Sequence, residues 1–165
     1  IGGIVVNNPV EFVGQTASGI RGEFTVLVPA GENVFCDGEM ALAFARERHA
    51  YSTGDRHRGE NQEQVIEKVI NKVTSSSTII SNYSEILNAL NGTFETNLAT
   101  EEITSLVKMQ LNNMSSWHIS SYNVDGTGGL QPTYSYPNQN LYVMNPNMET
   151  VSAAVQKLNE VLDEN

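Results

Sequence analysis

Basic residues and cysteines are scarce in this chain of 165 residues, and each shortage excludes a class of protein. Nine lysines and arginines face 19 acidic residues, so the net charge is −10 and non-specific binding to nucleic acid is disfavoured. The single cysteine, Cys36, excludes an internal disulfide and a zinc site built on paired cysteines. No apolar run approaches the roughly 18 residues that a membrane-spanning helix needs.

The length is that of one globular domain with a single hydrophobic core. Alternating apolar residues predict strands at residues 2–7, 22–31, 117–124 and 140–145. Apolar residues at helical spacing predict helices at residues 38–46 (capped by Asp37), from near Arg58 onward, at 99–114 and after Pro146. We expect an irregular excursion at residues 125–139. The predicted fold class is α/β, a mixed sheet covered by helices.

Four of the five arginines and two of the three histidines lie within residues 46–58. This cluster has a local charge of +2 before the histidines are considered, in a chain that is otherwise acidic. Three interpretations remain open at this point: a site for phosphate or pyrophosphate, a nucleic-acid contact, and a solvated loop with incidental salt bridges to Glu47, Asp55 or Glu60. A nucleic-acid contact needs a broad basic face, which nine basic residues do not supply.

The apolar stripe of the helix near Arg58 bears on these alternatives. Extending the stripe of Val65, Ile66 and Val69 backwards by one and two turns reaches Gln62 and Arg58. This register predicts that both side chains point inward, where a guanidinium needs an anionic partner. Arg46 and Arg48 are two residues apart and share a face if the chain is extended there, so they could converge with Arg58 on one phosphate.

The stretches DGEMALAFARERH and GDRHRGENQEQVI resemble the signature of the LytR-CpsA-Psr family. In that family an acidic-Gly-Glu-x-Ala-Leu helix with an aromatic residue leads into R-x-R, then D-x-x-R and a Gln four residues later. Those positions are here Arg46, Arg48, Asp55, Arg58 and Gln62. The opening IGGIVVNNP and the closing SYNVDGTGG and NLYVMNPN are also similar to family members, notably streptococcal ones, so the resemblance covers essentially the whole chain.

The resemblance implies an enzyme that transfers polyprenyl-pyrophosphate-linked glycopolymers, such as teichoic acid or capsular polysaccharide precursors, onto peptidoglycan. Such enzymes are anchored in the membrane and work on the extracellular face of the cytoplasmic membrane of Gram-positive bacteria. By resemblance Arg46, Arg48 and Arg58 are catalytic residues that bind the pyrophosphate together with Gln62, and Asp55 orients a guanidinium. The polyprenyl tail would lie in an apolar tunnel between sheet and helices, and Mg²⁺ would help to neutralise the phosphates.

The family's acidic metal ligands and one further arginine lie upstream of the strand that corresponds to residues 1–7. We therefore expect residues 1–165 to be the C-terminal half to two-thirds of a single LytR-CpsA-Psr domain, with an incomplete sheet, no transferase activity alone and a tendency to self-associate. The alternative is a non-catalytic module that binds a lipid phosphate or an anionic glycan and regulates cell-envelope synthesis. Such a module would need the arginines but no metal.

Overall fold

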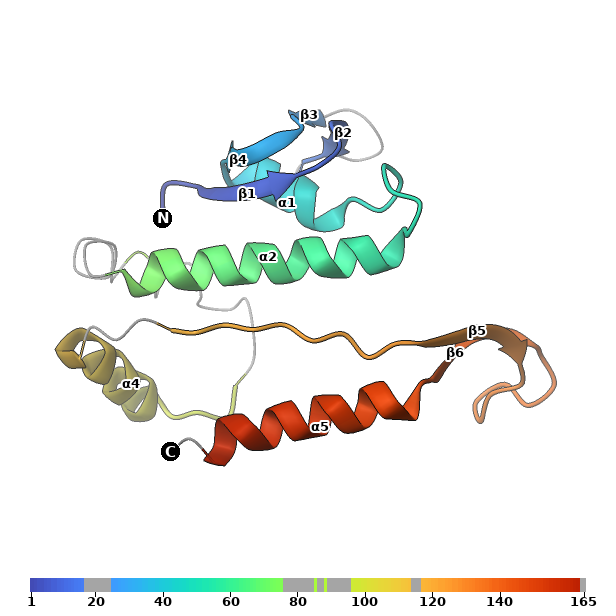
Figure 1. The fold of residues 1–165 in the computed structure, drawn as a ribbon. Helices are drawn as coiled ribbons and strands as arrows, with labels where there is room; N and C mark the ends of the chain where they lie inside the picture. The colour runs from blue at the N-terminus through green and yellow to red at the C-terminus, as the bar shows by residue number, and fades with distance from the viewer. Residues whose placement is uncertain (17–24, 76–84, 86–87, 89–95, 114–116, 164–165) are drawn as a thin grey trace. The chain divides into compact units, whose positions relative to one another are not determined.

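A computed structural model describes residues 1–16, 25–75, 85, 88, 96–113 and 117–163 (Figure 1). The chain forms two compact units, Ile1–Ile119 and Ser120–Asn165. The α/β fold class is confirmed, and the described strands pair as three small antiparallel sheets. Among the described helices, none combines the length and the apolar character that crossing a membrane requires.

Two antiparallel strand pairs form one layer of the first unit. Strand β1 (Ile4–Asn8) pairs with β4 (Gly31–Cys36), and β2 (Phe12–Gln15) pairs with β3 (Thr25–Val28). Side chains alternate along β1, so Ile4, Val6 and Asn8 are buried while their neighbours are exposed. β2 and β4 were not predicted, and the strand predicted at residues 22–31 is described only from Thr25.

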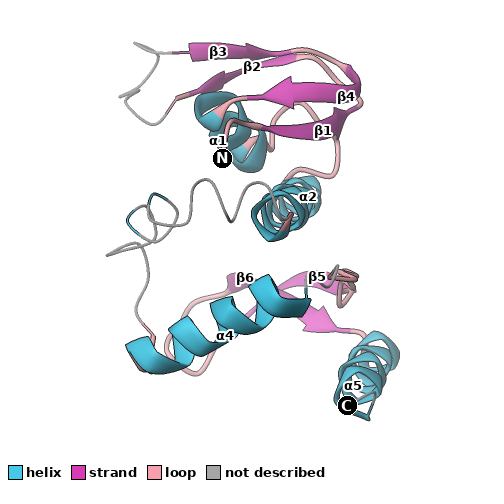
Figure 2. Ribbon diagram, turned by 90° about the vertical axis from the view of Figure 1, so that its left-hand side faces the viewer, coloured by secondary structure: helices cyan, strands magenta, loops and turns pink. Residues whose placement is uncertain are grey.

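Helices α1 (Gly38–Arg46) and α2 (Asp55–Thr74) lie on one side of these strands (Figure 2). The predicted cap of α1 is confirmed, because the Asp37 carboxylate accepts a hydrogen bond of 2.9 Å from the Met40 backbone N–H. A Cβ at Gly14 would come within 2.7 Å of the Ala43 Cβ, so β2 approaches α1 at a distance that only glycine allows. The core combines both layers and comprises Ile4, Val6, Phe12, Val28, Val34, Cys36, Ala43 and Phe44.

The stripe predicted on α2 is confirmed at Val65 and Val69, but its extension towards the helix start is wrong by one residue. The face that packs on the core carries Asn61, Val65 and Val69, whereas Ile66 is 57% exposed. The innermost side chain is thus polar: Asn61 Nδ2 donates 3.0 Å to the Phe44 carbonyl at the C-terminal end of α1, which also accepts a longer bond of 3.4 Å from the Glu47 backbone N–H. A pattern of apolar residues cannot show that an amide side chain takes the buried position. Because Asn61 takes it, Arg58 and Gln62 lie at the edge of this face and do not point into the core.

The first unit also contains α4 (Thr100–Asn113), close to the predicted range. The Glu102 carboxylate accepts 2.8 Å from the Ala99 backbone N–H and so caps the helix start. Gln110 is buried and links two segments, since its Nε2 donates 3.5 Å to the Thr74 carbonyl and its Oε1 accepts 2.8 Å from Trp117 Nε1.

The second unit is an antiparallel hairpin, β5 (Gly126–Gln131) with β6 (Leu141–Pro146), followed by α5 (Met148–Asp163). The strand predicted at residues 117–124 is wrong, because these residues have no strand partner among the described ones. β5 falls instead in the segment predicted to be irregular, since backbone pairing makes a strand of a glycine-rich run that propensity does not reveal. α5 has no buried side chain among its described residues.

The corrected register of α2 leads to a stability prediction. Asn61→Ala should lower the free energy of unfolding by about 0.5–1.5 kcal/mol, because the buried Phe44 carbonyl loses its shorter hydrogen bond and keeps only the 3.4 Å bond from the Glu47 N–H. The matched variant Ile66→Ala, on the exposed face of the same helix, should change it by less than about 0.5 kcal/mol. Urea unfolding measures both changes. A larger loss of stability in Ile66→Ala than in Asn61→Ala would favour the register predicted from sequence.

Candidate functional site

A cavity of about 530 Å³ opens where the end of α1, the first turns of α2 and strand β2 meet. We call it the arginine cavity; its lining is Arg46, Arg48, Arg58, Gln62, Glu47, His49, Val13, Gly14, Gln15 and Ala43. The four side chains that the sequence predicted as pyrophosphate ligands, Arg46, Arg48, Arg58 and Gln62, therefore surround one space. That they bind a phosphate stays a prediction.

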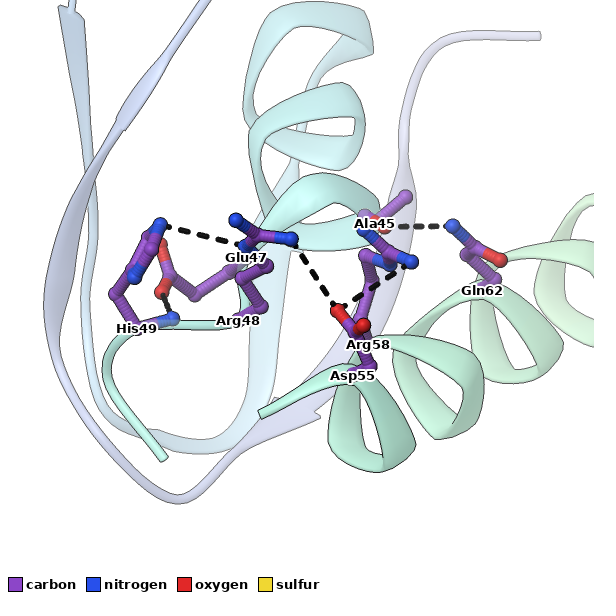
Figure 3. A network of polar contacts seen from close by, with 7 residues as sticks. All are labelled: Ala45, Glu47, Arg48, His49, Asp55, Arg58 and Gln62. Atoms are coloured by element: carbon purple, nitrogen blue, oxygen red, sulfur yellow. Dashed lines mark hydrogen bonds and ion pairs between the residues drawn. The ribbon is translucent and has the colours of Figure 1, made fainter. Parts of the chain in front are cut away.

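One carboxylate lies between two of the arginines. Asp55 Oδ1 is 3.6 Å from Arg48 Nη1 and 3.4 Å from Arg58 Nη2 (Figure 3). Two guanidinium groups that would repel each other are thus held on the same oxygen. Both ion pairs are substantially exposed, so each contributes only about 0–1 kcal/mol and can yield to a more highly charged anion.

The amide of Gln62 is used structurally in this arrangement. Its Nε2 donates 3.2 Å to the Ala45 carbonyl (Figure 3). Together with the neighbouring Asn61, which donates to Phe44, it satisfies two successive carbonyls at the C-terminal end of α1. These bonds hold Arg46, the last residue of α1, next to the helix that carries Arg58.

Glu47 shapes the loop that leads away from α1. Its Oε1 accepts hydrogen bonds from the backbone N–H groups of His49 and Ala50, the second at 2.7 Å. Arg48 Nε donates 3.5 Å to His49 Nε2 (Figure 3). The sequence patterns assigned no role to His49, and they left Gln15 out because strand β2 was not predicted.

Tyr51 ties the same loop to the sheet. Its hydroxyl donates 2.6 Å to Asn8 Oδ1, and Asn8, which is fully buried, donates through Nδ2 to the Pro29 carbonyl at 2.8 Å. The Tyr51 ring also packs on His57 of α2, with 3.4 Å between ring centroids. Burial, with a smaller contribution from Glu47, raises the pKa of the Tyr51 hydroxyl.

A second cavity, of about 580 Å³, has mainly apolar walls and lies at the N-terminal end of α1. Phe35, Cys36, Ala41 and Val69 are among its lining residues, and it shares none of them with the arginine cavity. Burial, reinforced by the negative charge of Asp37, raises the pKa of the Cys36 thiol and keeps it protonated near neutral pH. Within the described residues, no three His, Cys, Asp or Glu side chains gather in a way that could hold a metal ion.

The raised pKa of Tyr51 predicts a specific loss of stability at alkaline pH. The folded state favours the protonated hydroxyl, so its contribution is complete below the ordinary pKa of about 10 and is lost as pH rises through the raised value. In Tyr51→Phe the free energy of unfolding should fall less steeply as pH rises above about 10. Urea unfolding at several pH values tests this, and equal slopes in both proteins would contradict it.

The LytR_cpsA_psr family model matches residues 1–159 of the chain. Over 137 residues the chain is 34% identical to the polyisoprenyl-teichoic acid–peptidoglycan teichoic acid transferase TagU of Enterococcus faecalis, which covers 82% of this chain and 41% of that protein. Over 104 residues it is 33% identical to biofilm regulatory protein A of Streptococcus mutans, covering 63% of this chain and 25% of that protein. The chain thus spans less than half the length of these two relatives.

Solved structures show the same fold. The crystal structure of B. subtilis TagV superimposes with a TM-score of 0.66 at 24% identity, over 98% of this chain and 57% of that one. The crystal structure of protein gbs0355 from Streptococcus agalactiae gives a TM-score of 0.64 at 27% identity, over 92% of this chain and 48% of that one.

Proposed function

This chain belongs to the LytR_cpsA_psr family, and from that premise we propose that it is part of a phosphotransferase that moves polyprenyl-pyrophosphate-linked glycopolymers onto peptidoglycan. The names of relatives such as the E. faecalis transferase support this reaction class. The observation that carries the proposal is the meeting of Arg46, Arg48 and Arg58 at one cavity in a chain with a net charge of −10.

The arginine cavity suits a pyrophosphate for three physical reasons. Its volume of about 530 Å³ lies within the range of about 300–1,000 Å³ typical of small-ligand sites. Guanidinium groups match phosphate oxygens with paired, charge-assisted hydrogen bonds. The N-terminal end of α2 begins beside the cavity without a side-chain cap, so the positive end of its dipole adds to the attraction for an anion.

In the proposed reaction a peptidoglycan hydroxyl oxygen attacks the phosphorus that bears the glycopolymer. The bond from that phosphorus to the bridging oxygen breaks, the electron pair leaves with the polyprenyl phosphate, and the hydroxyl proton is released. The product is a phosphodiester between glycopolymer and peptidoglycan. Arg46, Arg48 and Arg58 would bind the phosphate oxygens and stabilise the charge that develops on the leaving phosphate, and Asp55 would orient two of the guanidinium groups.

Other parts of the proposal extend beyond the arginine cavity. An apolar cavity such as the one beside Phe35 suits a polyprenyl tail. We further propose that the enzyme is anchored in the membrane and acts on its extracellular face. Mg²⁺ would neutralise phosphate charge, but the described residues do not fit a Mg²⁺ site, since no three carboxylate or imidazole groups converge. No step here is assigned to the metal.

We also propose that this chain self-associates. Each strand pair of the first unit exposes one cross-strand pair of apolar side chains, Val5 with Phe35 and Val13 with Leu27. Exposed apolar side chains of this kind favour association. Sedimentation velocity should show dimers or larger species that increase with concentration, and a purely monomeric protein would contradict the proposal.

A second candidate is a regulatory module that binds a lipid phosphate or an anionic glycan without catalysis. Two observations favour it: one relative is named biofilm regulatory protein A, and the arginines converge without a metal-binding group among the described residues. Metal-dependent transfer of a labelled glycopolymer to peptidoglycan separates the two candidates. We expect no transfer by this chain alone, and turnover by it would contradict that expectation and exclude the purely regulatory module.

Arg58→Ala should weaken binding of a short-chain polyprenyl pyrophosphate by about tenfold to a hundredfold, because one charge-assisted contact to phosphate is lost. The matched control is Arg56→Ala, which removes an equal charge two residues away at a side chain that does not line the cavity and pairs with Glu60. Isothermal titration calorimetry with and without Mg²⁺ measures both.

The control decides what a loss of binding means. Equal weakening by Arg56→Ala and Arg58→Ala would show a general charge effect and contradict a site at the arginine cavity. If the unmodified chain does not bind the pyrophosphate, residues 46–58 are better interpreted as a solvated loop with incidental salt bridges. Binding that persists without Mg²⁺ would show that the arginines hold the pyrophosphate unaided.

A further inference from the structure

The hairpin of the second unit is uncharged in a strongly acidic chain. No Asp, Glu, Lys, Arg or His occurs between Asp125 and Glu149, although this segment carries three tyrosines and several Asn and Gln side chains. The region therefore offers aromatic rings and amide groups but no ionic partner. Such a surface is poorly suited to a phosphate or another charged ligand and suits a neutral, hydroxyl-rich one.

One face of the hairpin is apolar and exposed. Leu130 lies directly opposite Tyr142, and Gly128 opposite Met144, so these residues share a face of the two strands. Leu130 is 70% exposed and Tyr142 73%, and Met144 is also exposed. We call this surface, made of Gly128, Leu130, Tyr142 and Met144, the tyrosine face.

The ring of Tyr142 lies across the backbone of the neighbouring strand. A Cβ placed on Gly128 would be 2.5 Å from the Tyr142 hydroxyl oxygen and 2.9 Å from its Cε2. The ring occupies the space that a side chain at Gly128 would fill, and its other side is open to solvent. Because Gly128 has no side chain, the Tyr142 ring can lie against the backbone of β5 with one side exposed, which makes a flat aromatic platform.

We propose that the tyrosine face binds the glycan strand of peptidoglycan, the acceptor of the proposed transfer. An N-acetylhexosamine ring has a face of C–H groups that stacks on an aromatic ring, while its hydroxyl and acetamido groups bind amide side chains. Asn138, Gln139 and Asn140, all exposed in the connection between β5 and β6, offer such amides, whereas Gln131 and Asn145, hydrogen-bonded to each other at 3.1 Å, lie on the opposite face of the hairpin. The identity of the glycan rests on the proposed function; the platform itself does not.

The absence of charge selects the acceptor over the donor polymer. Teichoic acids are polymers of sugar-alcohol phosphates, and binding them would require cations that residues 126–148 lack. The N-acetylglucosamine units of a peptidoglycan strand are neutral. Tyr134, which is fully exposed, and Tyr136 lie in the connection between β5 and β6 and give aromatic surface for neighbouring sugar units.

The test titrates the full chain with a hexasaccharide of β-1,4-linked N-acetylglucosamine and follows the amide signals of residues 126–146 by NMR. We expect saturable shifts in the hairpin, a loss of affinity of about threefold to tenfold in Tyr142→Ala, and little change in Tyr142→Phe, which keeps the ring. Gly128→Val, which displaces the ring, should weaken binding like Tyr142→Ala.

The matched control is Tyr122→Ala. Tyr122 belongs to the same unit but lies outside the hairpin, where Lys157 Nζ is 5.4 Å from its ring centroid, so its loss should leave binding unchanged. Unperturbed hairpin signals, or equal losses in Tyr122→Ala and Tyr142→Ala, would overturn the proposal. So would preferential binding of a glycerol-phosphate oligomer, or a dimer of the chain that Tyr142→Ala abolishes, because these outcomes assign the face to the donor or to a second copy.

Titration of the same samples with inorganic pyrophosphate separates the two proposals. Hairpin shifts with the hexasaccharide but no pyrophosphate binding would sustain the tyrosine face and count against the arginine site. Pyrophosphate binding without any hexasaccharide response would overturn the tyrosine face alone. The backbone spectrum of Tyr142→Phe, compared with the unmodified chain, verifies that the hairpin remains folded in the variant expected to bind.

Discussion

The arrangement of the arginine cavity depends on how α2 satisfies the exposed C-terminal end of α1. An α-helix leaves its last carbonyls without intrahelical donors. Here Asn61 and Gln62, adjacent on α2, donate to the adjacent carbonyls of Phe44 and Ala45. Phe44 is itself a fully buried core residue, so these bonds connect the cavity directly to the packing of helix on sheet. Arg46 is the last residue of α1 and Arg58 lies in the first turn of α2. The two arginines come together because these hydrogen bonds join the two helix ends.

Three guanidinium groups at one cavity repel one another, and a carboxylate of the same chain reduces this repulsion. Asp55 contacts both Arg48 and Arg58, while Glu47 binds backbone N–H groups of the loop in between. The ion pairs are exposed and therefore weak, which suits side chains that must release one partner to bind another. Tyr51, bound to the buried Asn8, keeps the loop against the sheet. An acidic protein thus maintains a local excess of positive charge beside an anion-attracting helix end.

The sequence was sufficient for the parts of this structure that are governed by local rules. Asp37 as a helix cap, the positions of α1, α4 and β6, and the grouping of Arg46 with Arg58 all follow from short-range patterns. The register of α2 did not, because the stripe that includes Ile66 hides the fact that an amide, Asn61, takes the innermost position. Strands β2 and β5 were missed for a related reason: both depend on glycine and on a partner strand, which are tertiary effects. Gln15 was consequently absent from the predicted site.

An NMR titration of the arginine Nε–Hε signals with geranyl pyrophosphate tests the arginine cavity directly, with geraniol as the matched ligand that lacks phosphates. If the arginine cavity binds pyrophosphate, the signals of Arg46, Arg48 and Arg58 shift together with a single dissociation constant. Arg56, which lies outside the cavity, shifts little, and geraniol leaves all four unchanged. Equal small shifts in all four, or shifts with geraniol as large as with the pyrophosphate, would contradict a pyrophosphate site at the arginine cavity.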